Sequence, residues 1–321
     1  MPTPRFDVTT LGEVMIRLSV PPGQRLESAA SVDLHPGGAE GNFAVALARL
    51  KRRVAWVSRL PNNPLGRLIA NHLRSAGVDL GGVIWSETGR VGSYYLEFSA
   101  PPRPIQVVYD RADSCAAQMQ PDQIDWDYLL DTRLVHVTGI TPAISPSCRA
   151  VVTELVQRAR AASVPISFDI NYRARLWTEA EARATLVPLI QGVDLLFCGQ
   201  ADAGRIFGLG GEREGILRGL AEQTGAKNVV TTFGADGPMA WDGQRLWHEP
   251  ALPVEILDRL GAGDALAAGV VHGWLNGSLA EGLRYGVVLA ALILTQYGDM
   301  VLTTPDEVEM LLTRTGGGML R

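Results

Sequence analysis

The sequence predicts an α/β protein built on a mostly parallel sheet, and two observations carry this prediction. Apolar segments of strand length alternate along the chain with amphipathic segments of helical length. The strand-like segments are of the buried type, which is typical of a parallel sheet covered by helices on both faces. The 321 residues, 46% of them hydrophobic, suffice for a large core without disulfides or metals.

The alternation runs in order along the chain. The first strand (6–12, FDVTTLG) is followed by a helix (41–50) whose apolar residues recur at helical spacing, and then by a second strand. This β-α-β order continues. The expected strands are 6–12, 52–60, 133–139, 165–171, 194–199 and 227–234, and the expected helices are 41–50, 64–78, 145–163 and 178–193.

Two segments depart from this order. Residues 14–36 and 90–113 contain Pro-Pro turns and alternating apolar and polar residues, a pattern typical of β-hairpins. Each segment leaves the core and returns to it, so we expect one small sheet that covers the strand ends as a lid. The alternative is two unrelated surface hairpins. Because no repeat or linker divides the chain, we expect a single domain over residues 1–321.

Composition and charge exclude several classes of protein. A net charge of −5 without any basic run disfavours nucleic-acid binding. Three scattered cysteines indicate neither a disulfide framework nor a zinc site. The first residues do not resemble a secretory signal, and the longest apolar run is too short to span a bilayer. We therefore expect a cytoplasmic protein without membrane or nucleic-acid partners.

Missing motifs exclude further mechanisms. Only two of the 29 basic residues are lysines, so chemistry that depends on lysine is disfavoured. The chain has no P-loop, no G-x-G-x-x-G and no G-x-S-x-G, and its five histidines lack ligand spacing. P-loop NTPases, Rossmann enzymes, hydrolases and metalloenzymes are thereby disfavoured.

The strongest functional signal is residues 258–264, DRLGAGD, directly before a helix of small residues. Gly261, Ala262 and Gly263 would present unpaired amides at the positive end of the helix dipole, which is a site for an anion. Asp264 could then accept a proton from a hydroxyl that attacks a bound phosphate. The alternative is that Asp264 is an ordinary acid in a first helical turn.

Three other loops follow predicted strands, where open α/β sheets bind ligands. Each also has a structural explanation, namely a glycine turn, a surface salt bridge or a β-turn. The candidates are Gly37, Gly38 and Asn42 before the first helix, Asp169, Asn171 and Arg173 on one face of an extended segment, and Thr232, Gly234 and Gly237 in a turn able to hold phosphate.

The pairing of GGAEGNFAVALARL with DRLGAGDALAAG closely resembles the ribokinase-like (pfkB) carbohydrate kinases over nearly the whole chain. The resemblance implies a three-layer core, a β lid that often forms a dimer interface, ATP as phosphoryl donor and a sugar as acceptor. It makes Asp264 the catalytic base, Gly261, Ala262 and Gly263 the anion hole, and Thr232, Gly234 and Gly237 part of the nucleotide site. Asp258 would belong to a loop that binds a monovalent cation such as K⁺ in many relatives.

Within the family, GEVMIRLS, VVYDRADS, DINYRARLW and YGDMVLTTPDEVE resemble the 2-keto-3-deoxygluconate kinases. This resemblance places Gly38, Tyr94, Tyr109, Arg111, Asn171 and Arg173 around the acceptor. Arg111 and Arg173 suit an acceptor with a carboxylate, since each offers a forked cation. Tyr94 and Tyr109 could bond hydroxyls, or could simply pack within a hairpin.

The chain departs from the family at two motifs. The N-x-x-E segment that holds Mg²⁺ through water reads CGQADAG here, with Gly199 and Asp202 at the matching positions, so Asp202 is a weak candidate for the metal. Arg259 stands where many members have threonine.

We expect an ATP-dependent kinase that phosphorylates the terminal hydroxyl of 2-keto-3-deoxygluconate. The alternatives are a kinase for fructose, ribose or a nucleoside, and a non-catalytic sugar-binding relative.

Overall fold

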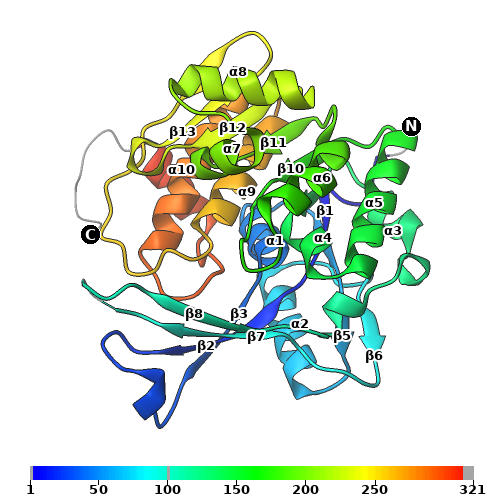
Figure 1. The fold of residues 1–321 in the computed structure, drawn as a ribbon, viewed down its shortest axis with the longest axis vertical. Coiled ribbons are helices and arrows are strands. Elements are labelled where there is room, and N and C mark those ends of the chain that lie inside the picture. Colours follow the sequence, from blue (N-terminus) through cyan, green and yellow to red (C-terminus); the bar gives the residue numbers. More distant parts are fainter. Residues whose placement is uncertain (1–2, 100–101, 314–321) are drawn as a thin grey trace.

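The computed structural model of the chain describes residues 3–99 and 102–313. Its large sheet has eight strands in the order β14-β13-β12-β11-β10-β9-β1-β4, and those from β12 to β4 run parallel (Figure 1). The predicted mostly parallel α/β sheet is therefore confirmed. The strands are β1 (Val8–Leu11), β4 (Val54–Val57), β9 (Val135–Thr138), β10 (Ile166–Asp169), β11 (Leu195–Phe197), β12 (Val229–Thr232), β13 (Pro238–Trp241) and β14 (Leu246–His248).

Two buried clusters, one on each face of this sheet, fix the positions of the helices. Alternate residues of a strand point to opposite faces, so Val230 joins one cluster while Val229 joins the other. The first cluster involves α1 (Ala39–Arg49), α2 (Pro64–Ala76), α9 (Ala262–Leu275) and α10 (Leu279–Leu294). The second involves α5 (Pro146–Ala161), α6 (Glu179–Ile190), α7 (Gln200–Phe207) and α8 (Arg213–Thr224).

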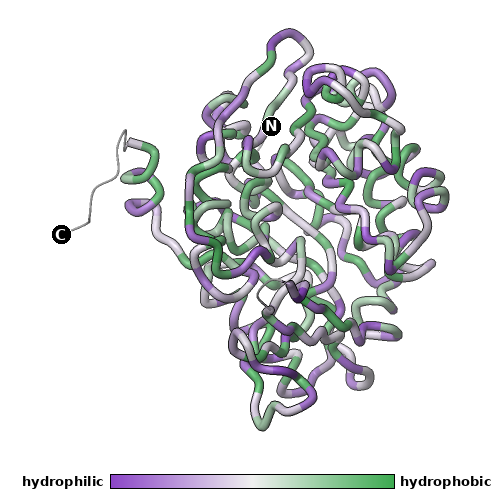
Figure 2. The backbone as a smooth tube through the Cα atoms, turned by 60° about the vertical axis from the view of Figure 1, so that its left-hand side comes forward, coloured by the Kyte–Doolittle hydropathy of each residue, from purple (hydrophilic) through white to green (hydrophobic). Residues whose placement is uncertain are grey.

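Shorter elements complete the chain. They are α3 (Trp126–Leu130), α4 (Ile140–Ile144), α11 (Pro305–Thr313) and the two-stranded sheet of β5 (Arg59–Pro61) and β6 (Ile84–Ser86). Figure 2 shows α11 at the margin of the molecule, on the way to the C-terminus. No helix among the described residues is long and apolar enough to cross a membrane.

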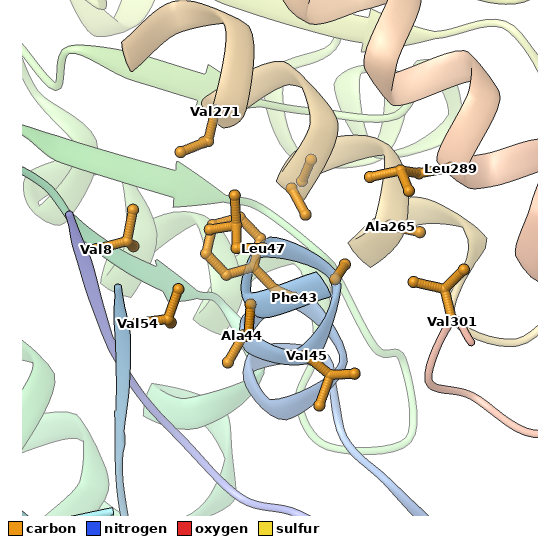
Figure 3. Packing of buried hydrophobic residues seen from close by; sticks show 14 of the residues in the cluster. Val8, Phe43, Ala44, Val45, Leu47, Val54, Ala265, Val271, Leu289 and Val301 are labelled. Atoms are coloured by element: carbon orange, nitrogen blue, oxygen red, sulfur yellow. The ribbon is translucent and has the colours of Figure 1, made fainter. Parts of the chain in front are cut away.

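Helix α1 lies at the centre of the first cluster. It packs between the strand residues Val8 and Val54 on one side and α9 and α10 on the other (Figure 3). Its Phe43 ring stacks on His136 of β9 with centroids 3.7 Å apart. This packing fixes the first turn of α1, which carries Asn42, against the large sheet.

Helices α9 and α10 cross at very close range because glycines face each other. A Cβ added to Gly269 would lie 2.4 Å from the main-chain nitrogen of Gly286, and one on Gly273 would lie 2.2 Å from that of Gly282. The small residues after Asp264 therefore serve this helix contact.

The lid is a separate four-stranded sheet in the order β3-β2-β7-β8, seen edge-on at the bottom of Figure 1. Its strands are β2 (Met15–Val20), β3 (Asp33–Gly37), β7 (Ser93–Glu97) and β8 (Gln106–Asp110). Because β2 pairs with β7, the two predicted hairpin segments form one sheet, and the alternative of two unrelated hairpins is wrong. Arg175, from the loop after β10, donates a hydrogen bond to the Val107 carbonyl of the lid.

The sequence also missed part of the order of elements. It placed two strands in succession at 194–199 and 227–234, whereas α7 and α8 lie between β11 and β12. The final strands β13 and β14 run antiparallel and extend the sheet beyond the predicted parallel part.

Candidate active site

The N-terminal end of α9 is the centre of the site. Gly261 precedes the helix with φ +83°, and no side chain caps it. The first main-chain bond of the helix runs from Ala265 N to Gly261 O at 2.9 Å. Within the part of the chain that the structure describes, the amides of 262–264 have no hydrogen-bond acceptor. Free amides at the positive end of a helix dipole are thus present where the sequence predicts an anion site.

Gly261 cannot be replaced without moving a neighbouring segment. A Cβ at this position would lie 2.1 Å from the main-chain oxygen of Asp299, and the left-handed φ itself disfavours other residues. The segment after α10 that carries Asp299 and the N-terminal end of α9 are thus packed together.

Two cavities meet at this helix end. One, of about 520 Å³, is lined by Gly261 and Asp264 together with residues of the lid and of the loop after β10. The other, of about 670 Å³, is lined by Ala262 and Gly263 together with β12, α10 and the segment 251–256. We refer to them below as the polar cavity and the apolar cavity. An anion bound by the amides would therefore lie where the two cavities meet.

Asp264 faces the polar cavity and is held by Asn42. The Asn42 Nδ2 donates to Asp264 Oδ2 at 2.7 Å, while Asn42 Oδ1 accepts from Gly38 N at 3.2 Å. The pKa of Asp264 is raised to about 8: burial is the largest cause and the nearby charge of Asp169 contributes, whereas the Asn42 bond acts in the opposite direction. Asn42, predicted to contact a ligand, is thus largely engaged in orienting this carboxylate.

The loop after β10 brings a second acid and a cation to the same place. Burial and the charge of Asp202 raise the pKa of Asp169 to about 7. Arg173 is exposed and lines the polar cavity, and no ion pair involves it among residues 3–99 and 102–313. Asn171, at φ +39°, turns its Nδ2 towards Asp169 Oδ2 at 3.3 Å and is not among the residues that line the cavity.

Arg111 also lines the polar cavity, but its guanidinium is partly occupied. Its Nε donates to Glu13 Oε2 at 2.8 Å, and its Nη2 donates to the same oxygen. Ser114 bonds the other oxygen of Glu13. Arg111 is therefore held in place by a buried carboxylate, and Nη1 is the nitrogen that takes no part in this contact.

The two tyrosines differ in their availability. Tyr94 is buried, and its hydroxyl donates to Asp299 Oδ2 at 2.5 Å. Tyr109 lies beside it with ring centroids 5.7 Å apart and is 39% exposed. Both line the polar cavity, as do Gly37 and Gly38. The Tyr94 hydroxyl is engaged by Asp299, whereas the Tyr109 hydroxyl has no hydrogen-bond partner among the described residues.

The apolar cavity contains the residues predicted for the nucleotide. Thr232, Gly234 and Gly237 line it, and the last two have positive φ in the turn between β12 and β13. Its other walls are mainly aliphatic side chains of α10 and of the segment 251–256, with Arg259 as a cation at its edge. A flat heterocycle with a phosphate chain directed to α9 fits this distribution of polarity.

The remaining two predicted residues lie outside both cavities. Asp202, in the first turn of α7, accepts a hydrogen bond from Tyr172 N at 3.1 Å, and burial raises its pKa. Asp258 is buried beneath the end of α9, where it accepts from Leu260 N at 3.1 Å and pairs with Arg17 at 2.6 Å.

Sequence reasoning assigned no role to Glu13, Arg17 or Asp299, which all contact predicted site residues. No sequence signal indicated Arg17. In the strand segment MIRLSV, alternation places Arg17 opposite the apolar Ile16, Leu18 and Val20, which predicts a solvent-facing side chain, whereas the structure buries residues on both faces of the strand.

The chain is similar to known carbohydrate kinases over nearly its whole length. The model of the pfkB family carbohydrate kinases matches residues 5–306. A 2-dehydro-3-deoxygalactonokinase of Haloferax volcanii is 38% identical over 316 residues, which is 98% of this chain and 99% of that protein. A 2-dehydro-3-deoxygluconokinase of Thermoproteus tenax is 31% identical over 96% of this chain and 94% of its own length.

A solved structure shows the same fold. The crystal structure of 2-dehydro-3-deoxygluconokinase from Thermotoga maritima superposes with a TM-score of 0.92 at 32% identity, and covers 97% of this chain and 99% of that one. The family match extends over nearly all of the described residues and includes the end of α9 and the lid. The chain therefore belongs to the pfkB family of carbohydrate kinases, and it is an ATP-dependent sugar kinase.

Proposed function

We propose that this kinase transfers the γ-phosphoryl group of ATP to the terminal hydroxyl of 2-keto-3-deoxygluconate. The observation that carries the proposal is the position of the α9 end between two cavities, with Asp264 facing the polar one and Ala262 and Gly263 facing the apolar one. ATP then occupies the apolar cavity and the sugar acid the polar cavity. Their reacting groups meet at the amides of 262–264.

The polar cavity suits a sugar that carries a carboxylate. Arg173 has a guanidinium free of ion pairs within the described residues, and Glu13 holds Arg111 in a fixed orientation beside it. Guanidinium groups bind carboxylates through charge-assisted hydrogen bonds. A neutral sugar would leave the Arg173 guanidinium without a partner. Tyr109 and the backbone at Gly37 and Gly38 remain for the hydroxyls of the sugar.

The proposed reaction uses Asp264 as the base. The terminal hydroxyl of the acceptor gives its proton to the Asp264 carboxylate, and its oxygen forms a bond to the γ-phosphorus. The bond from that phosphorus to the β,γ-bridging oxygen breaks, and ADP leaves with the electron pair. The α9 amides stabilise the negative charge on the transferred group. Asn42 keeps the carboxylate directed at the hydroxyl.

The residues present fit a magnesium ion that arrives with ATP. No cluster of three or more His, Cys, Asp or Glu suitable for a metal occurs in the described parts of the chain. Asp169 and Asp202, however, follow neighbouring strands and interact electrostatically. Mg²⁺ is often held by one or two carboxylates together with phosphate and water oxygens. Because neither carboxylate lines the cavity proposed for ATP, Asp169 and Asp202 would hold the ion through water, and the ion would neutralise charge on the phosphates.

The choice of acceptor also draws on the relatives. The relatives named 2-dehydro-3-deoxygluconokinase and 2-dehydro-3-deoxygalactonokinase act on keto-deoxy acids that differ at one stereocentre. The cations of the polar cavity match the group that these acids share. We name the gluconate-derived acid as the substrate, and the epimer is the comparison that tests the choice.

The test is a coupled ADP-release assay with Mg²⁺ and ATP over a panel of acceptors. The panel contains 2-keto-3-deoxygluconate, its galactonate-derived epimer, fructose, ribose and a nucleoside. We expect the highest kcat/KM for the first compound. A higher value for the epimer would move the assignment to that acid, and a preference for a neutral sugar would contradict the role of the two arginines.

Three further expectations belong to this proposal. We expect a cytoplasmic enzyme, since ATP is the donor. We also expect a homodimer formed through the lid region, where Leu34, Ile105 and Val108 are exposed. Light scattering during gel filtration measures the oligomeric state.

A requirement for K⁺ near Asp258 is tested by comparing activity in potassium and in tetramethylammonium salts.

A further inference from the structure

The lid carries one arginine that lies wholly inside the protein. Arg17 stands in the middle of β2 with 0% of its surface exposed. Its Nη1 lies 2.6 Å from Asp258 Oδ2 and 2.6 Å from Asp299 Oδ1. Removing three charged groups from water is costly unless they compensate one another, so this arrangement is a strong constraint on the fold around it.

The two aspartates belong to the two segments that build the end of α9. Asp258 begins the DRLGAGD loop, and its carboxylate accepts from Leu260 N at 3.1 Å and from Gly298 N at 3.2 Å. The main-chain oxygen of Asp299 packs directly against Gly261. A single nitrogen of the lid therefore fixes both segments beneath the amides of 262–264.

The lid makes a second contact with the same group. Tyr94 lies opposite Arg17 in the pairing of β2 with β7, and its hydroxyl bonds the other carboxylate oxygen of Asp299. Tyr94 also lines the polar cavity. The wall of the acceptor cavity and the end of α9 are thus joined through one carboxylate.

The remaining guanidinium nitrogens have no such partners. Arg17 Nε and Nη2 are buried without a hydrogen-bond partner among the described residues, although the guanidinium lies 5.2 Å from the centroid of the Phe98 ring. A side chain retained only for packing would not leave donors unsatisfied at a cost in stability. The ion pairs that Nη1 makes with Asp258 and Asp299 therefore explain why an arginine is buried at this position.

We propose that Arg17 is a positioning residue for phosphoryl transfer, which holds the α9 end in register with the acceptor wall through Asp258 and Asp299. It touches neither substrate. This inference rests on the proposed placement of the phosphoryl group at the amides of 262–264. The expected effect of Arg17 is on phosphoryl transfer at the α9 end and not on ATP binding, because neither Arg17 nor its two partners lines the apolar cavity.

The test is Arg17→Ala, assayed with whichever acceptor the wild-type enzyme phosphorylates best. We expect kcat to fall by about 10- to 100-fold, since a small misplacement of reacting groups has effects of this order, while KM for ATP changes less than about threefold. Guanidinium ion at non-denaturing concentration should restore part of kcat. Arg17→Lys, which keeps a cation near both aspartates, should lose less activity than Arg17→Ala.

Arg25→Ala is the matched control. Arg25 also belongs to the lid region and pairs with a buried acid, Glu97, at 2.9 Å, but it does not contact the α9 end. We expect its kcat to stay within about twofold of wild type if position at the helix end, and not loss of a buried pair, limits the rate.

A double variant, Arg17→Ala with Asp299→Asn, separates positioning from charge balance. It removes one of the uncompensated charges, so its melting temperature should rise above that of Arg17→Ala while kcat stays low. Recovery of both quantities would overturn the proposal, as would a kcat of Arg17→Ala within about threefold of wild type. An unchanged rate in Asp264→Asn would instead refute the proposed site, and a different preferred acceptor would refute only the substrate.

Discussion

The two cavities that meet at the α9 end are built in different ways. The polar cavity takes its lining from both ends of the chain, from Glu13 to Asp299, and contains carboxylates, guanidinium groups and three tyrosines. The apolar cavity takes its lining from residues 232 to 294 and has Arg259 as its one charged lining residue in the described part of the chain. With the acceptor and ATP placed in these cavities as we propose, the acceptor is selected by charge and hydrogen bonding, and the nucleotide chiefly by shape.

The largest expected effect comes from removing the group at the junction. Asp264→Asn should lower kcat by about 10²- to 10⁴-fold, because a positioned base contributes roughly that much. KM for ATP should change little, since the apolar cavity is lined by other residues. Steady-state kinetics with the preferred acceptor measure both constants.

The control for this variant is a measurement of its thermal stability. The amide of asparagine retains the shape of the carboxylate, so the melting temperature should stay close to that of wild type. Near-normal turnover in Asp264→Asn would show that this residue is not the base. It would also contradict our assignment of the acceptor to the polar cavity and of ATP to the apolar cavity.

The next effect should be confined to the polar cavity. Arg173→Ala should raise KM for an acidic acceptor by about 10- to 100-fold, because a hydrogen bond to a charged group contributes roughly 1.5–3 kcal/mol. KM for ATP should stay unchanged. Arg158→Ala, which removes an exposed arginine on α5 that pairs with Glu154, is the matched control. Equal loss with acidic and neutral acceptors would contradict charge selection.

A smaller effect should be confined to the apolar cavity. Ala290 lines this cavity from α10, and Ala290→Leu would fill part of its volume. Overpacking costs roughly 1–3 kcal/mol, so we expect KM for ATP to rise about tenfold. KM for the acceptor should be unaffected. A rise in the acceptor KM instead would place the nucleotide elsewhere.

The smallest effect concerns the pH dependence of kcat/KM. Asp264 acts as a base only when ionised, and burial raises its pKa to about 8, so kcat/KM should increase with pH through this region and level off above it. The charge of Asp169 adds to the increase in that pKa. Asp169→Asn should therefore shift this rise of kcat/KM to lower pH. A rise that stays at the same pH, or moves to higher pH, would show that the two carboxylates are not coupled.

The sequence was sufficient for features that depend on short segments. Strand-length apolar segments and amphipathic helices predicted the parallel sheet, and Gly261 to Asp264 predicted a helix end suited to an anion. The turn with Gly234 and Gly237 is also a local feature, because two glycines three residues apart are enough to predict a turn. These predictions succeeded since neighbouring residues fix secondary structure and helix ends.

The same reasoning assigned free functional groups where the structure shows engaged ones. Asn42 is bonded to Asp264, Arg111 to Glu13, and Tyr94 to Asp299, each with a partner about 98 to 222 residues away in the chain. A sequence lists the polar groups of a site, but it does not say which of them bond one another. That pairing follows only when the strands and the lid are brought together.

By itself, then, the sequence determined the layers of the fold, the glycine-rich start of α9 with its free amides, and the family. The tertiary structure decided which side chains remain available to an acceptor and that Arg17 is buried between Asp258 and Asp299. The physical reason is that apolar periodicity and glycine turns act over a few residues, whereas the compensation of buried charge requires partners 241 and 282 residues apart to meet in one place.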